Sequence, residues 1–157
     1  MQSDNTEKDI YTNEIYRFSV KVPENWKLYG QIINDSIQHK ALVDWGLPKI
    51  YSDIEKVEIE NSVSITAYHK SDINSVQELI ASEYFRSNSA KTALEVDSTC
   101  NNARIIYHTR NGIEYKGKSY FVFKNDIGYV IMFMATPGTY SKNLKTFEDF
   151  YKNIKYF

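Results

Sequence analysis

Cysteine is almost missing from this chain, which excludes a disulfide framework. Cys100 is the only cysteine, so no intrachain disulfide can form. It lies in the polar stretch of residues 98–102 and has no histidine beside it in the sequence. A cysteine nucleophile needs an activating base or cation nearby, so we do not expect a catalytic thiol.

Long apolar runs are missing as well. No stretch approaches the roughly 20 apolar residues of a membrane-spanning helix, so we expect no direct insertion into a membrane. Residues 1–9 are polar and carry no signal peptide. We expect residues 1–10 to form a flexible tether like those of exported bacterial lipoproteins, with the leader and lipid anchor already removed. This hypothesis places the protein in the periplasm or cell envelope, and a cytoplasmic protein is the alternative.

The chain has little excess charge of either sign. Its 19 Lys and Arg residues and 20 Asp and Glu residues give a net charge of −1. This balance gives no reason to expect binding to nucleic acid or to an anionic membrane. With 157 residues, the chain is predicted to form a single domain over residues 11–157 that needs no disulfide or metal to fold.

Aromatic residues, in contrast, are plentiful: the chain has 13 Tyr, 8 Phe and 2 Trp. Aromatic side chains favour strands and fill cores, so we expect most of them to build a sheet. An aromatic cage around a ligand is the alternative interpretation.

Apolar and polar residues alternate along several segments, and this pattern predicts strands. Asn111-Gly112 predicts a hairpin turn, and Gly117 suggests a bulge. Trp26 follows the turn after Pro23, and we expect it to be a structural plug against the first strand. The predicted strands cover residues 16–22, 62–70, 103–109, 115–123 and 129–136.

Two helices are predicted. Ser75 to Glu78 matches a capping box at the start of a helix over residues 76–85, and a closing helix over residues 141–153 places Leu144, Phe147 and Tyr151 on one stripe. The last strand is apolar on both faces, as expected of a central strand covered on both sides. The sequence therefore predicts an α+β fold, a three-layer α-β-α sandwich with a mainly antiparallel central sheet and the C-terminal helix on one face.

The layout of the chain resembles that of the PsbP-like proteins, the family of the photosystem II extrinsic subunit PsbP. Residues 18–26 are similar to its opening strand followed by Pro-x-x-Trp, residues 128–136 to its penultimate strand, and residues 147–157 to its closing helix and short terminal strand. A Ran-binding nuclear-import factor, bacterial lipoproteins and secretion chaperones share this fold. The resemblance implies an α-β-α sandwich that binds protein partners, and it carries no catalytic residue across.

No catalytic or metal-binding motif is present. His39, His69 and His108 lack metal-ligand spacing, so we expect no metal and no cofactor. Two other readings stay open: His69 and His108 lie on predicted strands and could face each other, and Arg104 and Arg110 with a lysine across the hairpin could form a basic patch. Three carboxylates alternate in a stripe that fits either a cation or a solvated strand edge; they are Glu55, Glu58 and Glu60.

The least regular segment is the best candidate for binding. Residues 32–57 break the alternation apart from a possible short strand at residues 41–45, and we expect a long excursion from the sheet, of the kind that often binds a partner. Trp45, Pro48 and Tyr51 are the candidate binding residues, because exposed aromatics are typical of interface hot spots.

Two functions are consistent with these observations. We favour a non-catalytic binding module, the soluble part of an exported lipoprotein with a protein partner. The alternative is a small ligand carrier or enzyme with a pocket between sheet and helix.

Overall fold

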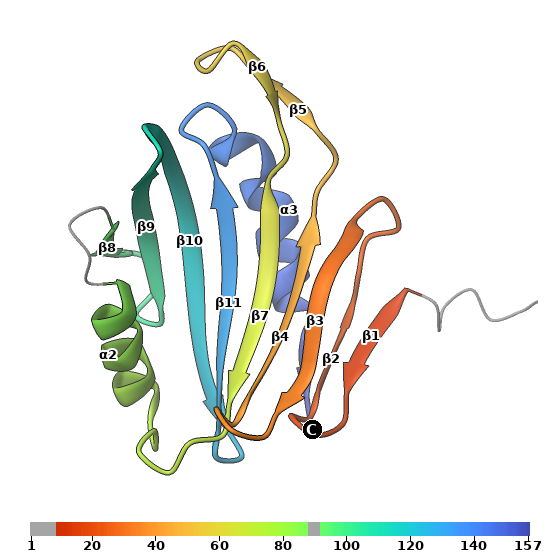
Figure 1. Ribbon diagram of the computed structural model, residues 1–157, viewed down its shortest axis with the longest axis vertical. Helices are drawn as coiled ribbons and strands as arrows, with labels where there is room; N and C mark the ends of the chain where they lie inside the picture. The colour runs from red at the N-terminus through yellow and green to blue at the C-terminus, as the bar shows by residue number, and fades with distance from the viewer. Residues whose placement is uncertain (1–8, 88–91) are drawn as a thin grey trace, which may run out of the picture.

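A large antiparallel sheet forms the centre of the computed structural model, which describes residues 9–87 and 92–157. Its seven strands are ordered β3-β4-β7-β11-β10-β9-β8, and each pairs antiparallel with its neighbours (Figure 1). In that order the strands are Lys27–Asp35, Lys40–Gly46, Ser62–Tyr68, Ile127–Ala135, Ile113–Lys124, Ala103–Arg110 and Thr92–Val96.

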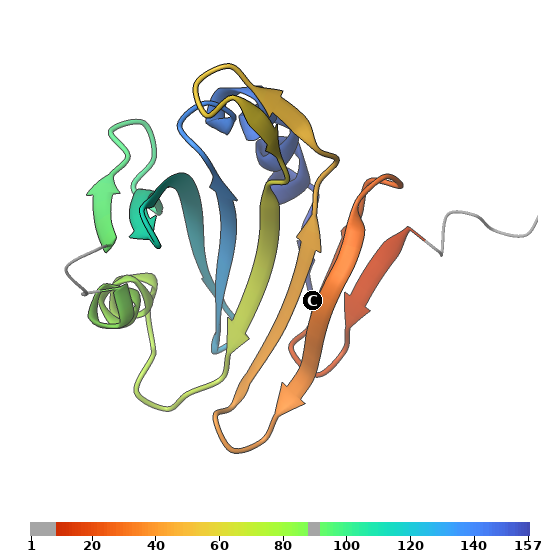
Figure 2. The same cartoon turned by 45° about the horizontal axis from the view of Figure 1, so that its top comes forward.

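Two smaller sheets flank the large one. The first has the order β1-β2-β12, and the second is the β5–β6 hairpin, which rises beyond one end of the large sheet (Figures 1 and 2). The hydroxyl of Tyr129 in β11 donates a hydrogen bond to the carbonyl of Tyr16 at 2.5 Å, which ties the three-stranded sheet to the large one. The strands are Ile10–Asn13 (β1), Phe18–Lys21 (β2), Ile50–Ser52 (β5), Val57–Ile59 (β6) and Lys155–Tyr156 (β12).

Helix α3, Tyr140–Lys152, packs on one face of the large sheet as predicted. Phe147 is fully buried, and its ring stacks on Phe133 of β11 with 5.3 Å between centroids. Leu144 and Tyr151 are partly buried against the same core. The buried face of α3 is wider than the sequence predicted, because Phe150 is buried as well.

Helix α2, Val76–Ser87, begins where the capping box predicts. The Ser75 hydroxyl accepts a hydrogen bond from the Glu78 backbone N–H at 3.1 Å. Leu79 packs with Phe121 and Val130, on the face of the large sheet opposite to α3. A helix of 12 residues is about 18 Å long, whereas seven paired strands are about 29 Å across. Helix α2 therefore covers only part of that face.

The hairpin between β9 and β10 is confirmed, and the bulge at Gly117 is not. Asn111 and Gly112 have φ angles of 53° and 77°, the left-handed conformations that a tight two-residue turn needs. Strand register is continuous on both sides of Gly117. A Cβ at this position would collide with the carbonyl oxygen of Phe133, so the glycine serves a close approach of backbone rather than a bulge.

The expected excursion over residues 32–57 is largely wrong. Its first part belongs to β3 and β4 of the large sheet, and only the β5–β6 hairpin lies outside it. Strand β3 is an edge strand whose side chains are nearly all exposed, so it has no buried face to impose an alternation. Its register also shifts twice, between Leu28 and Gly30 and between Ile32 and Asp35.

Asp9, the first described residue, is joined to the body of the protein by a backbone hydrogen bond. Residues 1–8 of the expected tether lie outside the described residues, and the backbone N–H of Val22 donates to the carbonyl of Asp9 at 2.6 Å. No helix in the described part of the chain is long and apolar enough to cross a membrane.

Candidate functional site

The three predicted binding residues do not share one surface. Pro48 and Tyr51 are exposed, but Trp45 is only 3% exposed, so the prediction that it lies on an exposed loop is wrong. Trp45 is part of β4, in which Ala41, Val43 and Trp45 point to the core. The break at residues 46–48 made the end of this strand look like a loop.

The β5–β6 hairpin carries Tyr51 and is held firmly to the body of the protein. The Lys142 ammonium of α3 donates to the Tyr51 carbonyl at 2.8 Å. The Glu55 carboxylate accepts from the Gly138 backbone N–H at 3.0 Å. Ser52, which pairs with Val57 beside the turn of the hairpin, is fully buried. Tyr51, Ile54 and Val57 are exposed at 51%, 70% and 51%, so a fixed hairpin presents three apolar side chains to solvent.

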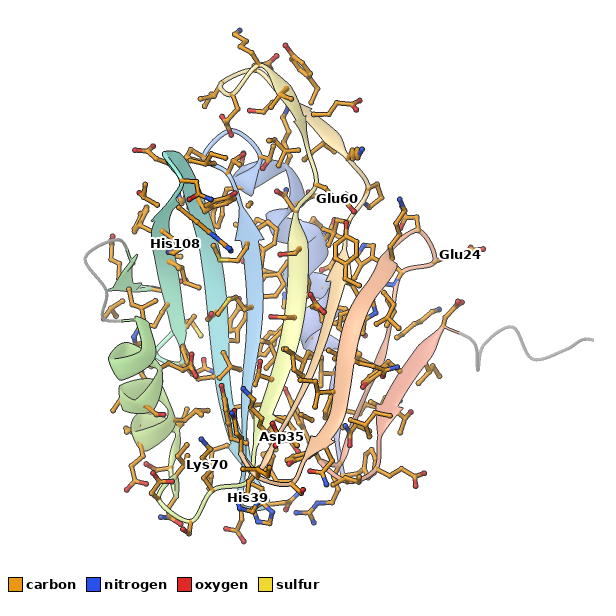
Figure 3. The ribbon with its side chains drawn as sticks, viewed as in Figure 1. Glu24, Asp35, His39, Glu60, Lys70 and His108 are labelled. Atoms are coloured by element: carbon orange, nitrogen blue, oxygen red, sulfur yellow. The ribbon has the colours of Figure 1, made fainter. Side chains whose placement is uncertain are left out.

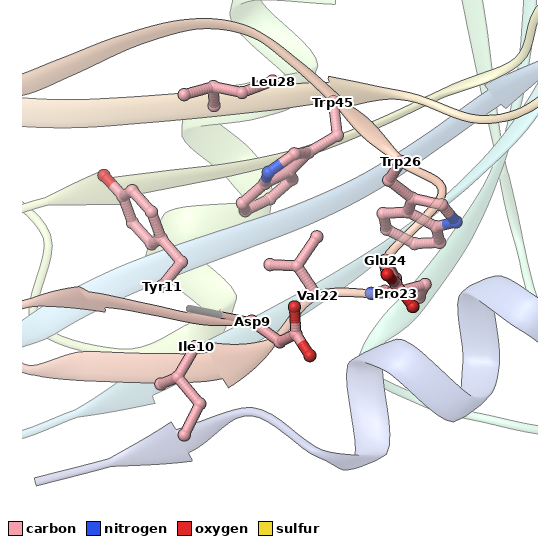
Figure 4. Close-up of a pocket in the computed structure, with 9 residues that line it drawn as sticks. All are labelled: Asp9, Ile10, Tyr11, Val22, Pro23, Glu24, Trp26, Leu28 and Trp45. Carbon is pink, nitrogen blue, oxygen red and sulfur yellow. The ribbon is translucent and has the colours of Figure 1, made fainter. Parts of the chain in front are cut away.

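A pocket of about 240 Å³ lies between the three-stranded sheet and the end of β4. Three aromatic rings line it: Tyr11 from β1, Trp26 just before β3, and Trp45 from β4 (Figure 4). Tyr11 meets Trp45 edge-on with 5.6 Å between centroids, and the centroids of Trp26 and Trp45 are 6.5 Å apart. Burial raises the pKa of the Tyr11 hydroxyl above its ordinary value.

The pocket also has two carboxylates, Asp9 and Glu24 (Figure 4). Among the described residues, neither forms an ion pair with a lysine or arginine. Trp26 is 8% exposed, and its other contact is Phe150 of α3 at 4.9 Å. The burial expected of Trp26 is confirmed, its ring packs on Trp45 and Phe150, and it forms a wall of the pocket as well.

The structure does not bring His69 and His108 together. His69 and His108 are not neighbours: β11 and β10 separate β7 from β9. His39 and His108 lie toward opposite ends of the sheet (Figure 3). Instead, the His69 backbone N–H donates to the His39 carbonyl at 3.0 Å, because the register pairs Lys40 with Tyr68. His39, His69 and Asp126 line one open pocket. No group in the described part of the chain has the His, Cys, Asp and Glu ligands for a metal.

The possible basic patch of Arg104 and Arg110 with a lysine across the hairpin does not form. Lys116 and Lys118 are opposite Tyr107 and Ile105, on the other face of the sheet. Lys118 is 7% exposed, within 3.1 Å of both Asp97 and Glu148. Hydrogen bonds from the Thr99 hydroxyl and backbone N–H, together with Lys118, lower the pKa of Asp97 to about 2. Burial alone would lower the pKa of Lys118, but its hydrogen bonds to neighbouring groups outweigh that effect and raise it. This cluster is structural.

The face of the sheet on the α2 side has an apolar pocket of about 250 Å³. Met132 and Met134 of β11 and Phe121 of β10 line it, together with the Ser119 side chain. The Ser119 hydroxyl is buried and has no hydrogen-bond partner among the residues that the structure describes. Sequence reasoning did not indicate this pocket, because its residues come from separate strands and share no motif.

Comparison with known proteins places the fold. No family model matches the chain, and no curated protein matches it. The solution structure of cyanobacterial PsbP (CyanoP) from Synechocystis sp. PCC 6803 is similar over 94% of this chain and 91% of its own length, with a TM-score of 0.51 and 10% identity. A crystal structure from Bacteroides thetaiotaomicron VPI-5482 is similar over 95% of this chain, with a TM-score of 0.51 and 14% identity. This chain spans about half, 48%, of that second protein.

Proposed function

We propose that this chain, which has the PsbP-like fold, is a non-catalytic binding module that docks a protein partner through the β5–β6 hairpin. The carrying observation is that three apolar side chains of that hairpin, Tyr51, Ile54 and Val57, are exposed. Apolar side chains that stay exposed together usually mark an interaction site. A loop held on a rigid scaffold loses little conformational entropy on binding.

The attachment of the hairpin supports this role. The Lys142 and Gly138 contacts to its backbone and to Glu55 fix its orientation without covering the side chains of Tyr51, Ile54 and Val57. Pro48, at the entry to the hairpin, is also exposed. The docking surface we propose therefore keeps Pro48 and Tyr51 from the sequence prediction and replaces the buried Trp45 by Ile54 and Val57.

Truncating the side chains of Tyr51 and Ile54 should weaken partner binding without unfolding the protein. We expect the double variant Tyr51→Ala, Ile54→Ala to capture its partner from the native envelope fraction at least about tenfold less well, since truncating hot-spot residues costs 2 kcal/mol or more. The matched control is Ile37→Ala, which removes another exposed apolar side chain, from the turn between β3 and β4. A folded double variant that retains every protein captured by the parent would show that the hairpin is not the docking surface.

Export and lipid anchoring are part of the same proposal. The polar composition of residues 1–8 supports a tether that holds the domain away from a membrane in the periplasm or cell envelope. We also propose that α2 represents the second helical layer of a three-layer α-β-α arrangement. Incorporation of labelled palmitate into the native protein would test the anchor.

A small-ligand carrier is the second candidate. The aromatic pocket supports it, although that pocket lies between the three-stranded sheet and β4 rather than between the large sheet and a helix.

A further inference from the structure

The rings that line the aromatic pocket leave space between them. Tyr11 and Trp45 meet at 89°, and Trp26 and Trp45 meet at 53° with 6.5 Å between centroids. The three rings are edge-on or tilted to one another rather than stacked in parallel, and they line the remaining space together with Val22 and Leu28. The remaining space is about 240 Å³. A cavity of roughly 150 Å³ holds benzene, so this pocket takes a group somewhat larger than benzene.

The charge at the pocket is of one sign. Asp9 and Glu24 line it (Figure 4), and in the described part of the chain neither has a basic partner within ion-pair distance. The nine described lining residues include no Lys, Arg or His. A positive group that enters would therefore meet two carboxylates with no competing cation, and an anion would be repelled.

We propose that this pocket binds a small organic cation, a compact alkylammonium or quaternary ammonium group. The faces of Trp and Tyr rings attract such cations, and each contact contributes about 0.5–2 kcal/mol. Alkylammonium groups also bury apolar surface against the rings, which a hydrated metal ion does not. The proposal is independent of the hairpin, since no residue of β5 or β6 lines the pocket.

Fluorescence offers a direct test, because Trp26 and Trp45 are the only two tryptophans of the chain and both line the pocket. Choline is the probe, and 3,3-dimethyl-1-butanol is its neutral carbon analogue of the same shape. We expect a saturable change of tryptophan fluorescence with choline and an affinity at least about tenfold weaker for the neutral analogue, which corresponds to the attraction of one or two rings. Sodium chloride at equal concentration controls for ionic strength.

Variants and a second readout locate the site. Asp9→Asn combined with Glu24→Gln should weaken choline binding at least about fivefold while leaving the neutral analogue unaffected. Ile37→Ala, in the turn between β3 and β4 and outside the pocket, should leave choline binding unchanged. Chemical-shift changes of the two indole N–H groups in an NMR titration check the fluorescence. Equal affinity for choline and its neutral analogue, or no saturable response by either method, would overturn the proposal and leave the hairpin proposal standing.

Discussion

Replacing Phe147 by alanine is expected to lower the free energy of unfolding by about 3–5 kcal/mol, the usual cost of truncating a fully buried phenylalanine. Phe147 is 0% exposed, and its ring packs on Phe133 at 5.3 Å and on Tyr120 at 5.8 Å. These contacts join α3 to β10 and β11, so removing the ring leaves a cavity in the core between them.

Thermal and denaturant melts followed by circular dichroism would measure the effect. For a chain of this size, the expected loss lowers the melting temperature by roughly 10 °C. Thr146→Ala, at an exposed position of the same helix, should change stability by no more than about 0.5 kcal/mol. A similar small shift for Phe147→Ala would mean that α3 does not face the core.

Replacing Lys118 by methionine is expected to cost about 3 kcal/mol at neutral pH. Methionine keeps the length of the side chain but leaves Asp97 and Glu148 without the cation that lies 3.1 Å from each. Removing one partner of a buried ion pair typically costs 3–5 kcal/mol, and the lower end applies because the Glu148 side chain is 30% exposed.

The cost of Lys118→Met should depend on pH in a defined direction. The pKa of Asp97 is lowered to about 2 in the folded protein, so its stabilisation is present above the ordinary pKa near 4 and is lost as pH falls toward 2. The loss caused by Lys118→Met should therefore shrink between about pH 5 and pH 2. Breaking the exposed Lys145–Asp149 pair by Lys145→Met should cost much less, because solvent screens exposed ion pairs. A pH-independent loss for Lys118→Met would contradict this account of the cluster.

Several parts of the fold that the sequence predicted have one-sided burial or an obligatory turn. Strand β7 alternates between buried and half-buried positions, and Asn111-Gly112 needs left-handed backbone. Strand β3 could not be predicted in this way, because an edge strand with exposed side chains and two register shifts has no dominant period. Missing β3 made β4 look like an isolated segment, and Trp45 look like a loop residue.

The pockets depend on contacts between distant segments. Tyr11, Trp26 and Trp45 meet only because the β1–β2 hairpin folds against the end of β4. The aromatic excess allowed a ligand cage as one interpretation, but it could not say which rings form it. His39 and His69 likewise meet through the register of β4 with β7.

The most direct test of the proposed function is site-specific photocrosslinking in the native envelope. A photoreactive phenylalanine analogue is placed at Tyr51, in strand β5 of the hairpin, and in a matched protein at Ile37, which is 88% exposed in the turn between β3 and β4. If the hairpin docks a protein partner, the analogue at position 51 forms one discrete adduct that the analogue at position 37 does not form. No adduct from position 51, or the same adducts from both positions, would contradict the proposal.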